Sequence, residues 1–304
     1  MDARVTPPPA AFDLSAWMQR QLARVEDALS RWVRADAPAG LGQAMRYAAL
    51  GGGKRLRPLL ALAACEAVRG NGEAALRAAC AVELIHAYSL VHDDMPCMDN
   101  DVLRRGQPTV HVRFGQAQAL LAGDALQALA FELLTPDGDG VPPAAQARLC
   151  RLLARAAGAD GMAGGQAIDL ASVGKRLDEA ALRHMHRLKT GALLQASVLM
   201  GAACGQTDER AARALERFGA ALGLAFQVVD DVLDVTQDSA TLGKTAGKDA
   251  ASDKPTYVAL MGLERAQAHA QELLAEALAA LAGGGLADAR ALAALADMVV
   301  NRSK

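Results

Sequence analysis

The sequence predicts an all-α protein. Alanine and leucine dominate the hydrophobic residues, which make up 52% of the 304 residues, whereas aromatic residues make up only 3%. Runs of β-branched and aromatic residues, which favour strands, are scarce. Apolar residues instead recur at helical spacing along nearly every long segment. We therefore expect a single domain over residues 1–304, with about ten helices and two buried helices at its centre.

The helices are expected in the following order. Two stretches, residues 73–95 and 212–235, are apolar on nearly all sides, which is typical of buried central helices. The remaining helices have one apolar face, and we expect them over residues 14–34, 41–50, 57–69, 116–134, 143–157, 178–203, 256–282 and 286–300. Turn-forming residues interrupt the pattern between them, most densely over residues 51–53, 158–175, 236–255 and 283–285.

The overall composition excludes several classes of function. The net charge is -2, so there is no general electrostatic attraction to nucleic acid. No apolar stretch reaches the roughly 18 residues that a membrane span needs. The five cysteines are dispersed and form no CxxC pair, which favours a reducing cytoplasm over a disulfide or zinc framework. Residues 1–13 lack the apolar core of a signal peptide, and we expect a short disordered leader there.

Two acidic clusters lie at the C-terminal ends of the two most apolar helices. The first is HDDMPCMDND over residues 92–101, and the second is DDVLD over residues 230–234. Asp230 and Asp234 are four residues apart and share a helix face. Asp93 and Asp99 are six apart, roughly 240° around an ideal helix. Because Pro96 would end or distort the helix between them, Asp99 is free to return beside Asp93.

These clusters have two interpretations. A solvated acidic face explains most short Asp-Asp pairs, but here the flanking residues, SLVH and FQVV, are typical of a core. Carboxylates clustered in apolar surroundings are strongly disfavoured without a counter-charge. Hard oxygen ligands suit Mg²⁺, which typically bridges substrate phosphates. We therefore favour a Mg²⁺ site.

Basic residues accompany both acidic clusters. The turn GGGKRLRP over residues 51–58 carries three cations but is not a P-loop, because Arg55 follows Lys54 and no strand precedes it. Each basic residue alone is most simply a solvated surface charge. Beside two Mg²⁺-type clusters, however, the set indicates a site for two diphosphates. Its other members are Arg104 and Arg105, Lys189 within KTG, and Lys244, Lys248 and Lys254.

The combination of these motifs resembles the short-chain trans-prenyl diphosphate synthases, most closely those that make farnesyl diphosphate in bacteria. The segments GGGKRLRP, ELIHAYSLVHDDMPCMDNDVLRRG, GGQAIDL, KTG, FQVVDDVLD and GKTAGKD occur in that family's order, and the likeness covers about residues 14–302. It implies an isoprenoid-synthase fold with helices around a central cavity, commonly homodimeric. It also implies Mg²⁺-dependent condensation of isopentenyl diphosphate with dimethylallyl or geranyl diphosphate to (2E,6E)-farnesyl diphosphate.

The resemblance assigns roles to the residues that match the family's motifs. The implied Mg²⁺ ligands are Asp93, Asp99 and Asp230, with Asp94 and Asp234 in support. The residues implied for the isopentenyl diphosphate are Lys54, Arg57, His86 and Arg105. Those for the allylic diphosphate are Arg104, Lys189, Lys244 and Lys254. Thr190 and Gln227 would place oxygens near the developing allylic cation. The expected catalytic residues are Asp93, Asp94, Lys189, Thr190, Gln227 and Asp230. Segment 236–255, Arg302 and Lys304 are candidate closing elements.

Product length depends on the depth of the pocket. Tyr88 lies five residues before Asp93, about 7.5 Å deeper along the helix axis. The family uses bulk near this level as a floor, and an aromatic residue there resembles producers of C15 chains. Ser89 is too small to close the pocket by itself. Because residues 97–101, CMDND, also resemble geranylgeranyl-type synthases, C20 and C10 products remain alternatives.

Three rival functions fit the sequence less well. Glu83-x-x-His86 on a buried helix suggests a di-iron bundle, but that site needs a second such pair, and the sequence has none. A terpene cyclase would want aromatic walls to steady cations, and this chain has only five Phe, two Trp and three Tyr. A non-catalytic partner subunit of a synthase would be favoured by loss of one aspartate motif, but both motifs are intact.

Overall fold

The computed structural model describes residues 12–138, 140–175, 177–236 and 256–302. The expected leader therefore lies almost wholly outside the described residues. The helices are α1 (Leu14–Trp32), α2 (Leu41–Leu50), α3 (Leu56–Ala67), α4 (Gly72–Asp93), α5 (Val110–Phe114), α6 (Gln116–Leu134), α7 (Pro143–Ala157), α8 (Met162–Ala171), α9 (Glu179–His186), α10 (Ala192–Ala203), α11 (Glu209–Thr236), α14 (Tyr257–Met261), α15 (Leu263–Ala282) and α16 (Arg290–Val300). A short 3-10 helix, η1, spans Pro38–Gly40, and a π-helical turn, η2, spans Arg187–Gly191.

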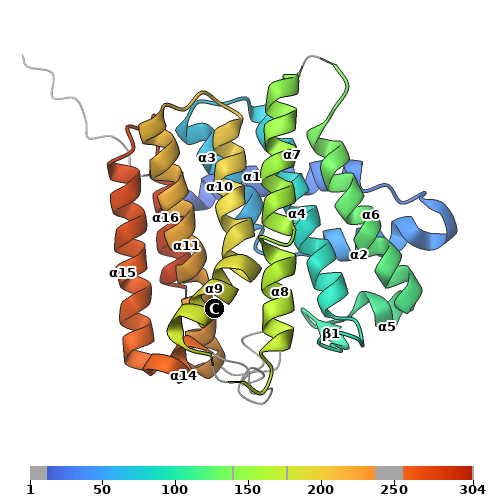
Figure 1. The fold of residues 1–304 in the computed structure, drawn as a ribbon. Coiled ribbons are helices and arrows are strands. Elements are labelled where there is room, and N and C mark those ends of the chain that lie inside the picture. The colour runs from blue at the N-terminus through green and yellow to red at the C-terminus, as the bar shows by residue number, and fades with distance from the viewer. Residues whose placement is uncertain (1–11, 139, 176, 237–255, 303–304) are drawn as a thin grey trace, which may run out of the picture.

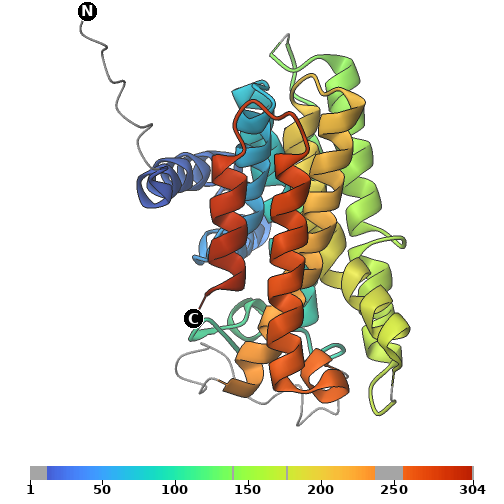
Figure 2. The ribbon, with the colours of Figure 1, turned by 90° about the vertical axis from the view of Figure 1, so that its left-hand side faces the viewer.

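Most of the long helices, such as α10, α11 and α15, run side by side with their axes nearly parallel (Figure 1). Packing passes from α6 through α4, α3, α10 and α11 to α15. Figure 2 shows α15 and α16 as an antiparallel pair, with α1 crossing beside them. Within the described ranges, the strands are β1 (Leu103–Arg104) and β2 (Gln107–Pro108), which pair antiparallel in a small hairpin after α4. The all-α prediction is confirmed.

Helix α4 is the central helix that its sequence predicts. It begins at the N-cap Asn71, whose side-chain oxygen accepts hydrogen bonds from the backbone N–H groups of Glu73 and Ala74, at 2.9 and 3.0 Å. Most of its residues, from Ala74 to Val91, are buried. Two groups of buried side chains form the core, one around α4 and one around α11.

The second predicted central helix, α11, is not apolar on all sides along its whole length. Over the first half, Glu209, Arg213, Glu216 and Arg217 form an exposed polar face. The polar face is visible in the sequence, where these residues recur at helical spacing. The opposite face of the first half enters the core through Leu215 and Phe218, and the run from Ala221 to Val229 is buried almost throughout.

Three stretches differ from the predicted helix pattern. Residues 158–175, predicted as a break, contain α8, although its two glycines disfavour a helix. A Cβ atom at Gly165 would overlap the backbone of Lys189, so glycine lets α8 approach η2. The predicted helix 178–203 is divided into α9, η2 and α10. The predicted helix 256–282 is likewise interrupted at Gly262, whose φ of 82° glycine adopts without strain.

Within the described residues, two helices are long and apolar enough to cross a membrane by length and composition, which corrects the expectation that no stretch reaches that length. They are α4 and α6, and 72% of the most apolar window of α4 is buried against other helices. Such burial is what a central core helix requires. In α6 the corresponding share is 39%, with Leu120 and Leu121 exposed. Length and composition alone are not evidence of a membrane span, since core helices meet the same criteria.

Candidate active site

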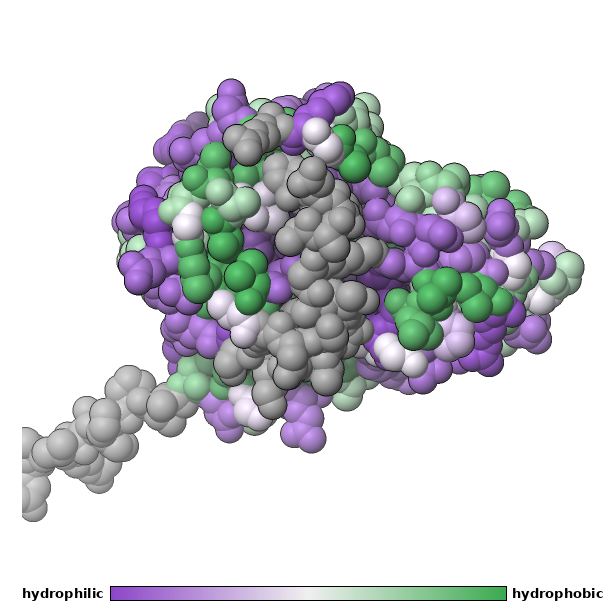
Figure 3. Space-filling view, turned by 90° about the horizontal axis from the view of Figure 1, so that it is seen from below, coloured by the Kyte–Doolittle hydropathy of each residue, from purple (hydrophilic) through white to green (hydrophobic). Residues whose placement is uncertain are grey.

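Helices α4 and α11 end at the same end of the bundle, so both acidic clusters lie there (Figure 1). Figure 3 looks onto this end of the molecule, where both hydrophilic and hydrophobic side chains are visible. The hairpin β1–β2 lies at the same end (Figure 1). The turn that follows α4 brings Arg104 back to the first acidic cluster, where it pairs with Asp94.

The first acidic cluster folds back on itself. Helix α4 ends at Asp93, and the backbone N–H of Asp99 donates a hydrogen bond to the Asp93 carbonyl at 2.9 Å. Asp101 bonds in the same way to the Asp94 carbonyl at 3.1 Å, and Asn100 takes the left-handed conformation that the turn requires. The prediction that the chain returns Asp99 beside Asp93 is confirmed.

The Asp93 carboxyl lies in surroundings that call for a cation. Burial raises its pKa to about 6; the nearby Lys189 ammonium lowers that pKa, and the Asp99 carboxylate raises it further. Two hard oxygen donors in a partly desolvated place fit Mg²⁺, which takes its remaining ligands from water and substrate phosphates. The described part of the chain holds no ready-made group of three or more acidic, His or Cys ligands. The fit is therefore that of an ion shared with a substrate.

The Asp94 carboxylate forms an ion pair with Arg104 and is not a second exposed carboxylate beside Asp93. Arg104 donates from Nε to both Asp94 oxygens at 2.9 Å and from Nη2 at 2.5 Å, and the Asp94 side chain is only 3% exposed. The guanidinium is thereby fixed at the foot of α4. These bonds use Nε and Nη2, so the Nη1 edge can meet an anion.

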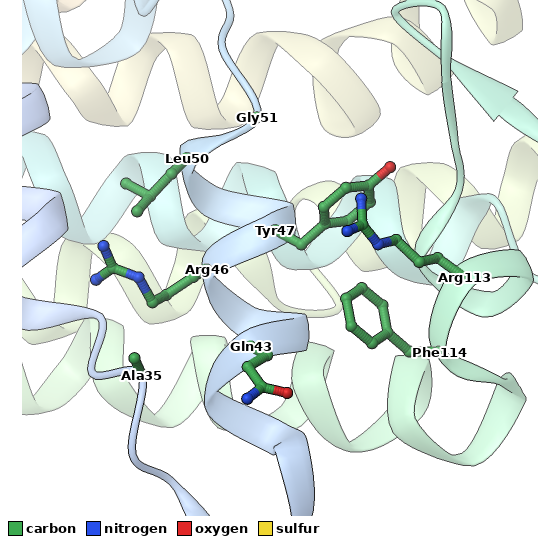
Figure 4. A pocket seen from close by; sticks show the side chains of 8 residues that line it. All are labelled: Ala35, Gln43, Arg46, Tyr47, Leu50, Gly51, Arg113 and Phe114. Atoms are coloured by element: carbon green, nitrogen blue, oxygen red, sulfur yellow. The ribbon is translucent and has the colours of Figure 1, made fainter.

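Aromatic stacking anchors the hairpin that carries Arg104. The Tyr47 hydroxyl donates to the Pro108 carbonyl at 2.7 Å, and the Arg113 guanidinium lies 4.4 Å from the centre of the Tyr47 ring. Phe114 meets the same ring edge-on at 5.4 Å. These side chains line a pocket of about 550 Å³ on the outer surface between α2 and α5 (Figure 4). Figure 4 shows Arg113 lying against Tyr47, while Arg46 points away on the opposite side.

The first two aspartates of the second acidic cluster have different surroundings. Asp230 is partly exposed and pairs with Arg302, whose guanidinium lies 4.3 Å from the centre of the Phe226 ring. Asp231 is buried and accepts hydrogen bonds from Gln227 Nε2 at 2.8 Å and from the Tyr257 backbone N–H at 2.7 Å. Asp231 thus joins α11 to α14, a role that the sequence analysis missed. The four-residue spacing from Gln227 was its available signal.

Lys189 and Thr190 lie on the π-helical turn η2. Lys189 Nζ pairs with the Asp169 carboxylate of α8 at 2.5 Å. The Thr190 hydroxyl donates to Gln227 Oε1 on α11 at 3.1 Å. The structure therefore places these three predicted residues together. Asp169, in the segment GGQAIDL, was given no role from the sequence, and it orients the lysine.

Two of the remaining predicted cations, Arg57 and Arg105, lie near His86. Burial and the nearby Arg57 and Arg105 guanidinium groups hold the pKa of His86 well below its usual value. Burial and Arg302 lower the pKa of Lys54, while Asp230 raises it, so Lys54 faces the second acidic cluster. The Arg57 Nε is buried and has no hydrogen-bond partner within the described chain. This concentration of positive charge fits a diphosphate. Lys244 and Lys254, with Lys248 and Lys304, lie outside the described residues.

The two residues expected to set chain length lie on α4, and both are partly buried. The Tyr88 ring meets the His92 ring edge-on at 5.6 Å, and His92 Nε2 lies 3.1 Å from the Leu120 carbonyl of α6. A Cβ atom at Gly123 would overlap the His92 ring, so α6 packs tightly there. Tyr88 is thereby held in place. The Ser89 hydroxyl donates to the His86 carbonyl of its own helix at 2.9 Å.

Comparisons with known proteins agree with this geometry. Residues 38–290 match the polyprenyl synthetase family. A Bradyrhizobium diazoefficiens protein named "Probable farnesyl diphosphate synthase" is 52% identical over 272 residues, 88% of this chain and 81% of that protein. The Arabidopsis thaliana heterodimeric geranylgeranyl pyrophosphate synthase large subunit 1 is 46% identical over 299 residues, 97% and 81% of the two chains. A geranyltransferase structure from Helicobacter pylori, complexed with magnesium and isoprenyl diphosphate, has a TM-score of 0.83 and 34% identity, covering 97% of this chain and 98% of that one.

The buried His186 next to this site predicts a specific acid sensitivity. Its side chain stacks on Tyr257 at 5.6 Å, and neither ring nitrogen has a hydrogen-bond partner within the described residues. Burial lowers its pKa to about 4; Asp169 opposes this shift, and Lys189 adds to it. The unfolded chain, with an ordinary His pKa of about 6.5, binds the proton more tightly. Stability is therefore lost as the pH falls from about 6.5 towards about 4.

We expect His186 to account for a loss of about 2 kcal/mol in the free energy of unfolding between about pH 7.5 and about pH 5. His186→Phe keeps an aromatic ring against Tyr257 and removes the titration, so its free energy of unfolding should fall less over this range. Urea unfolding at both pH values measures the difference. His184→Phe, at an exposed position two residues earlier, is the control and should keep the wild-type pH dependence. Equal pH dependence in all three proteins would contradict the assignment.

Proposed function

This chain belongs to the polyprenyl synthetase family, and we propose that it uses Mg²⁺ to condense isopentenyl diphosphate with dimethylallyl and then geranyl diphosphate, giving (2E,6E)-farnesyl diphosphate. It is a trans-prenyltransferase with the all-α isoprenoid-synthase fold, as the sequence predicted. One observation carries the proposal for the substrates: two acidic clusters and two sets of cations meet at one end of the bundle. Such a site suits two diphosphates, one of which must leave.

The allylic diphosphate would bind between the first acidic cluster and η2. Arg104, fixed by Asp94, and Lys189, fixed by Asp169, would hold its oxygens from opposite sides. Mg²⁺ on Asp93, Asp99 and Asp230 would supply the positive charge that stabilises the departing diphosphate. The Thr190 and Gln227 oxygens would face the allylic carbon as positive charge develops there.

The isopentenyl diphosphate would bind among Lys54, Arg57, His86 and Arg105. The Arg57 and Arg105 guanidinium groups lower the pKa of His86, and a diphosphate bound among them would balance their positive charge. The double bond of this substrate then attacks the allylic carbon, the allylic C–O bond breaks, and a proton is lost from the new chain. Holding both diphosphates in fixed places aligns the reacting carbons and excludes water from the allylic cation.

The C15 product is proposed from the position of Tyr88. Its ring is fixed by His92 and, through His92, by α6, so it fits a rigid floor beneath the growing chain. Relatives of this chain are named both for farnesyl and for geranylgeranyl products. The general likeness therefore supports the reaction, and the local bulk of Tyr88 supports the shorter product over C20.

The first test is incubation of the purified protein with isopentenyl diphosphate, dimethylallyl diphosphate and Mg²⁺, with product length measured by mass spectrometry. We expect a dominant C15 diphosphate that is lost with EDTA. Asp93→Asn should lower kcat by on the order of a hundredfold or more, because it removes a charge that holds the ion. Asp27→Asn, at an exposed carboxylate paired with Arg31, is the control and should keep wild-type activity.

Two outcomes of this assay would change the proposal. A dominant C10 or C20 product would keep the reaction and overturn the C15 assignment. If neither dimethylallyl nor geranyl diphosphate is condensed, the chain would instead be the non-catalytic partner of a synthase.

Tyr88→Ala tests the floor directly. Removing the ring opens space below the pocket, so the product should lengthen from C15 towards C20 while the protein stays active. The matched control Tyr88→Phe keeps the bulk of the ring and should keep C15 as the main product. The ratio of C20 to C15 in the product mixture is the measurement. An active Tyr88→Ala protein that still makes only C15 would remove Tyr88 from the floor.

We also propose that the chain acts as a homodimer in the cytoplasm. Three large apolar side chains on α5 and α6 are about half exposed: Val112, Leu120 and Leu121. All five cysteines are free thiols, which supports a reducing compartment.

Sedimentation velocity should give the mass of two chains. Leu121→Glu should shift the protein towards one chain, whereas Leu278→Glu, at an exposed position of α15, should leave the dimer intact. A wild-type monomer would refute the dimer.

A further inference from the structure

Arg55 differs from the other cations of the turn GGGKRLRP because it faces the core. Its side chain is only 2% exposed. Nε donates to Glu26 at 2.7 Å, Nη1 donates to Glu83 at 2.7 Å, and Nη2 donates to the Ala49 carbonyl at 2.8 Å. Every nitrogen of the guanidinium is therefore bound within the protein. Arg55 has no edge left for a substrate anion.

The backbone at Arg55 is bent to make this possible. Arg55 has φ 49° and ψ 35°, the left-handed conformation, at the N-cap of α3. For a residue with a Cβ this costs about 1–2 kcal/mol, so the surrounding contacts must hold it there. The bend sends Arg55 inward, while Lys54 and Arg57 stay within the electrostatic reach of Asp230. Arg55 thus points into the core, whereas Lys54 and Arg57 lie within reach of the second acidic cluster.

A second contact fixes the turn from the other side. Arg105 Nη1 donates to the Gly52 carbonyl, and a Cβ atom at Gly53 would lie 2.9 Å from Arg105 Nη1 and Nη2. Gly53 has φ 137°, which glycine adopts without strain. The turn is therefore held between Arg105 on its outer side and Arg55 in the core.

Glu83 is the buried negative charge of this assembly. It lies on α4, one turn before His86, and its side chain is 5% exposed. Burial lowers the pKa of both Arg57 and Arg105, and Glu83 raises both. Glu83 is thus near three arginines at once. Its pairing with Arg55 also leaves no iron-binding role for the Glu83-x-x-His86 spacing.

We propose that Arg55 and Glu83 are positioning residues for the isopentenyl diphosphate pocket. Through their ion pair they orient Lys54 and Arg57, and Glu83 balances the positive charge of the pocket when no diphosphate is bound. Neither residue touches the substrate. This inference rests on the proposed function for the identity of the substrate, but not on the length of the product.

The first experiment separates the two substrates. Arg55→Met removes the guanidinium, so the turn loses its tether and Glu83 is left as an unpaired buried charge that repels diphosphate. We expect KM for isopentenyl diphosphate to rise by about tenfold or more, and KM for geranyl diphosphate to stay within about twofold. Arg34→Met, which breaks the exposed Arg34–Asp36 pair, is the control and should change neither KM. An unchanged KM for isopentenyl diphosphate, or an equal rise in both KM values, would overturn the proposal.

A second variant keeps the test valid if Arg55→Met is unstable. The double variant Arg55→Met/Glu83→Gln also removes the buried carboxylate that has lost its Arg55 partner, so the thermal midpoint should recover relative to Arg55→Met. The turn remains untethered, and KM for isopentenyl diphosphate should stay raised. Full recovery of this KM in the double variant would show that Arg55 only neutralises Glu83 and does not orient the turn.

Glu83→Gln tests the charge balance without any turnover. Glutamine still offers an oxygen to Arg55, but the pocket loses its negative charge. We expect a lower thermal midpoint in the ligand-free protein and a larger rise on adding inorganic diphosphate than in the wild type, because the ligand replaces the missing charge. An equal rise would contradict the charge-balancing role. Because this readout needs no reaction, its failure is distinct from failure of the condensation assay.

Discussion

The structure depends on holding charges of both signs in partly dry surroundings at one end of a helical bundle. Isolated buried charges are costly, and here the carboxylates that shape the site have cationic partners: Asp94 with Arg104, Asp169 with Lys189, and Glu83 with Arg55. Each pair joins two segments that are distant in the sequence or separated by a turn. The pairs therefore serve two purposes, since they compensate buried charge and also fix the side chains that would meet the substrate anions.

This arrangement needs helices that approach one another closely. Glycine at position 165 lets α8 reach η2, where Asp169 can hold Lys189, and glycine at position 123 lets α6 reach His92 on α4. The π-helical turn η2 places Lys189 towards α8 and Thr190 towards α11 in consecutive positions. The backbone is irregular at η2, where consecutive side chains contact two different helices. It is also irregular at Arg55, whose left-handed conformation accompanies a side chain that points into the core.

Sequence reasoning predicted most of the helices because their apolar spacing is a local property. It also predicted the return of Asp99 to Asp93, since Pro96 is a local signal. It failed where tertiary packing decides: α8 forms despite Gly164 and Gly165, and η2 interrupts a regular apolar pattern. Arg55, Asp169 and Asp231 were missed as positioning residues for the same reason. Their partners, except Gln227 for Asp231, lie on other elements, and no spacing in the sequence reveals them.

The separation between the charged groups and the proposed floor has a consequence for how products vary in this family. Tyr88 is five residues from Asp93 on a rigid helix, so a change in bulk there leaves the pairs around Asp94 and Lys189 untouched. His92, however, is next to Asp93 in the sequence and also contacts Tyr88. Tyr88 therefore cannot shift far without also moving His92, the neighbour of Asp93. Substituting the floor residue itself is therefore a smaller perturbation than moving α6 against α4. Relatives named for different chain lengths can therefore share one reaction site and differ in the residue that forms the floor.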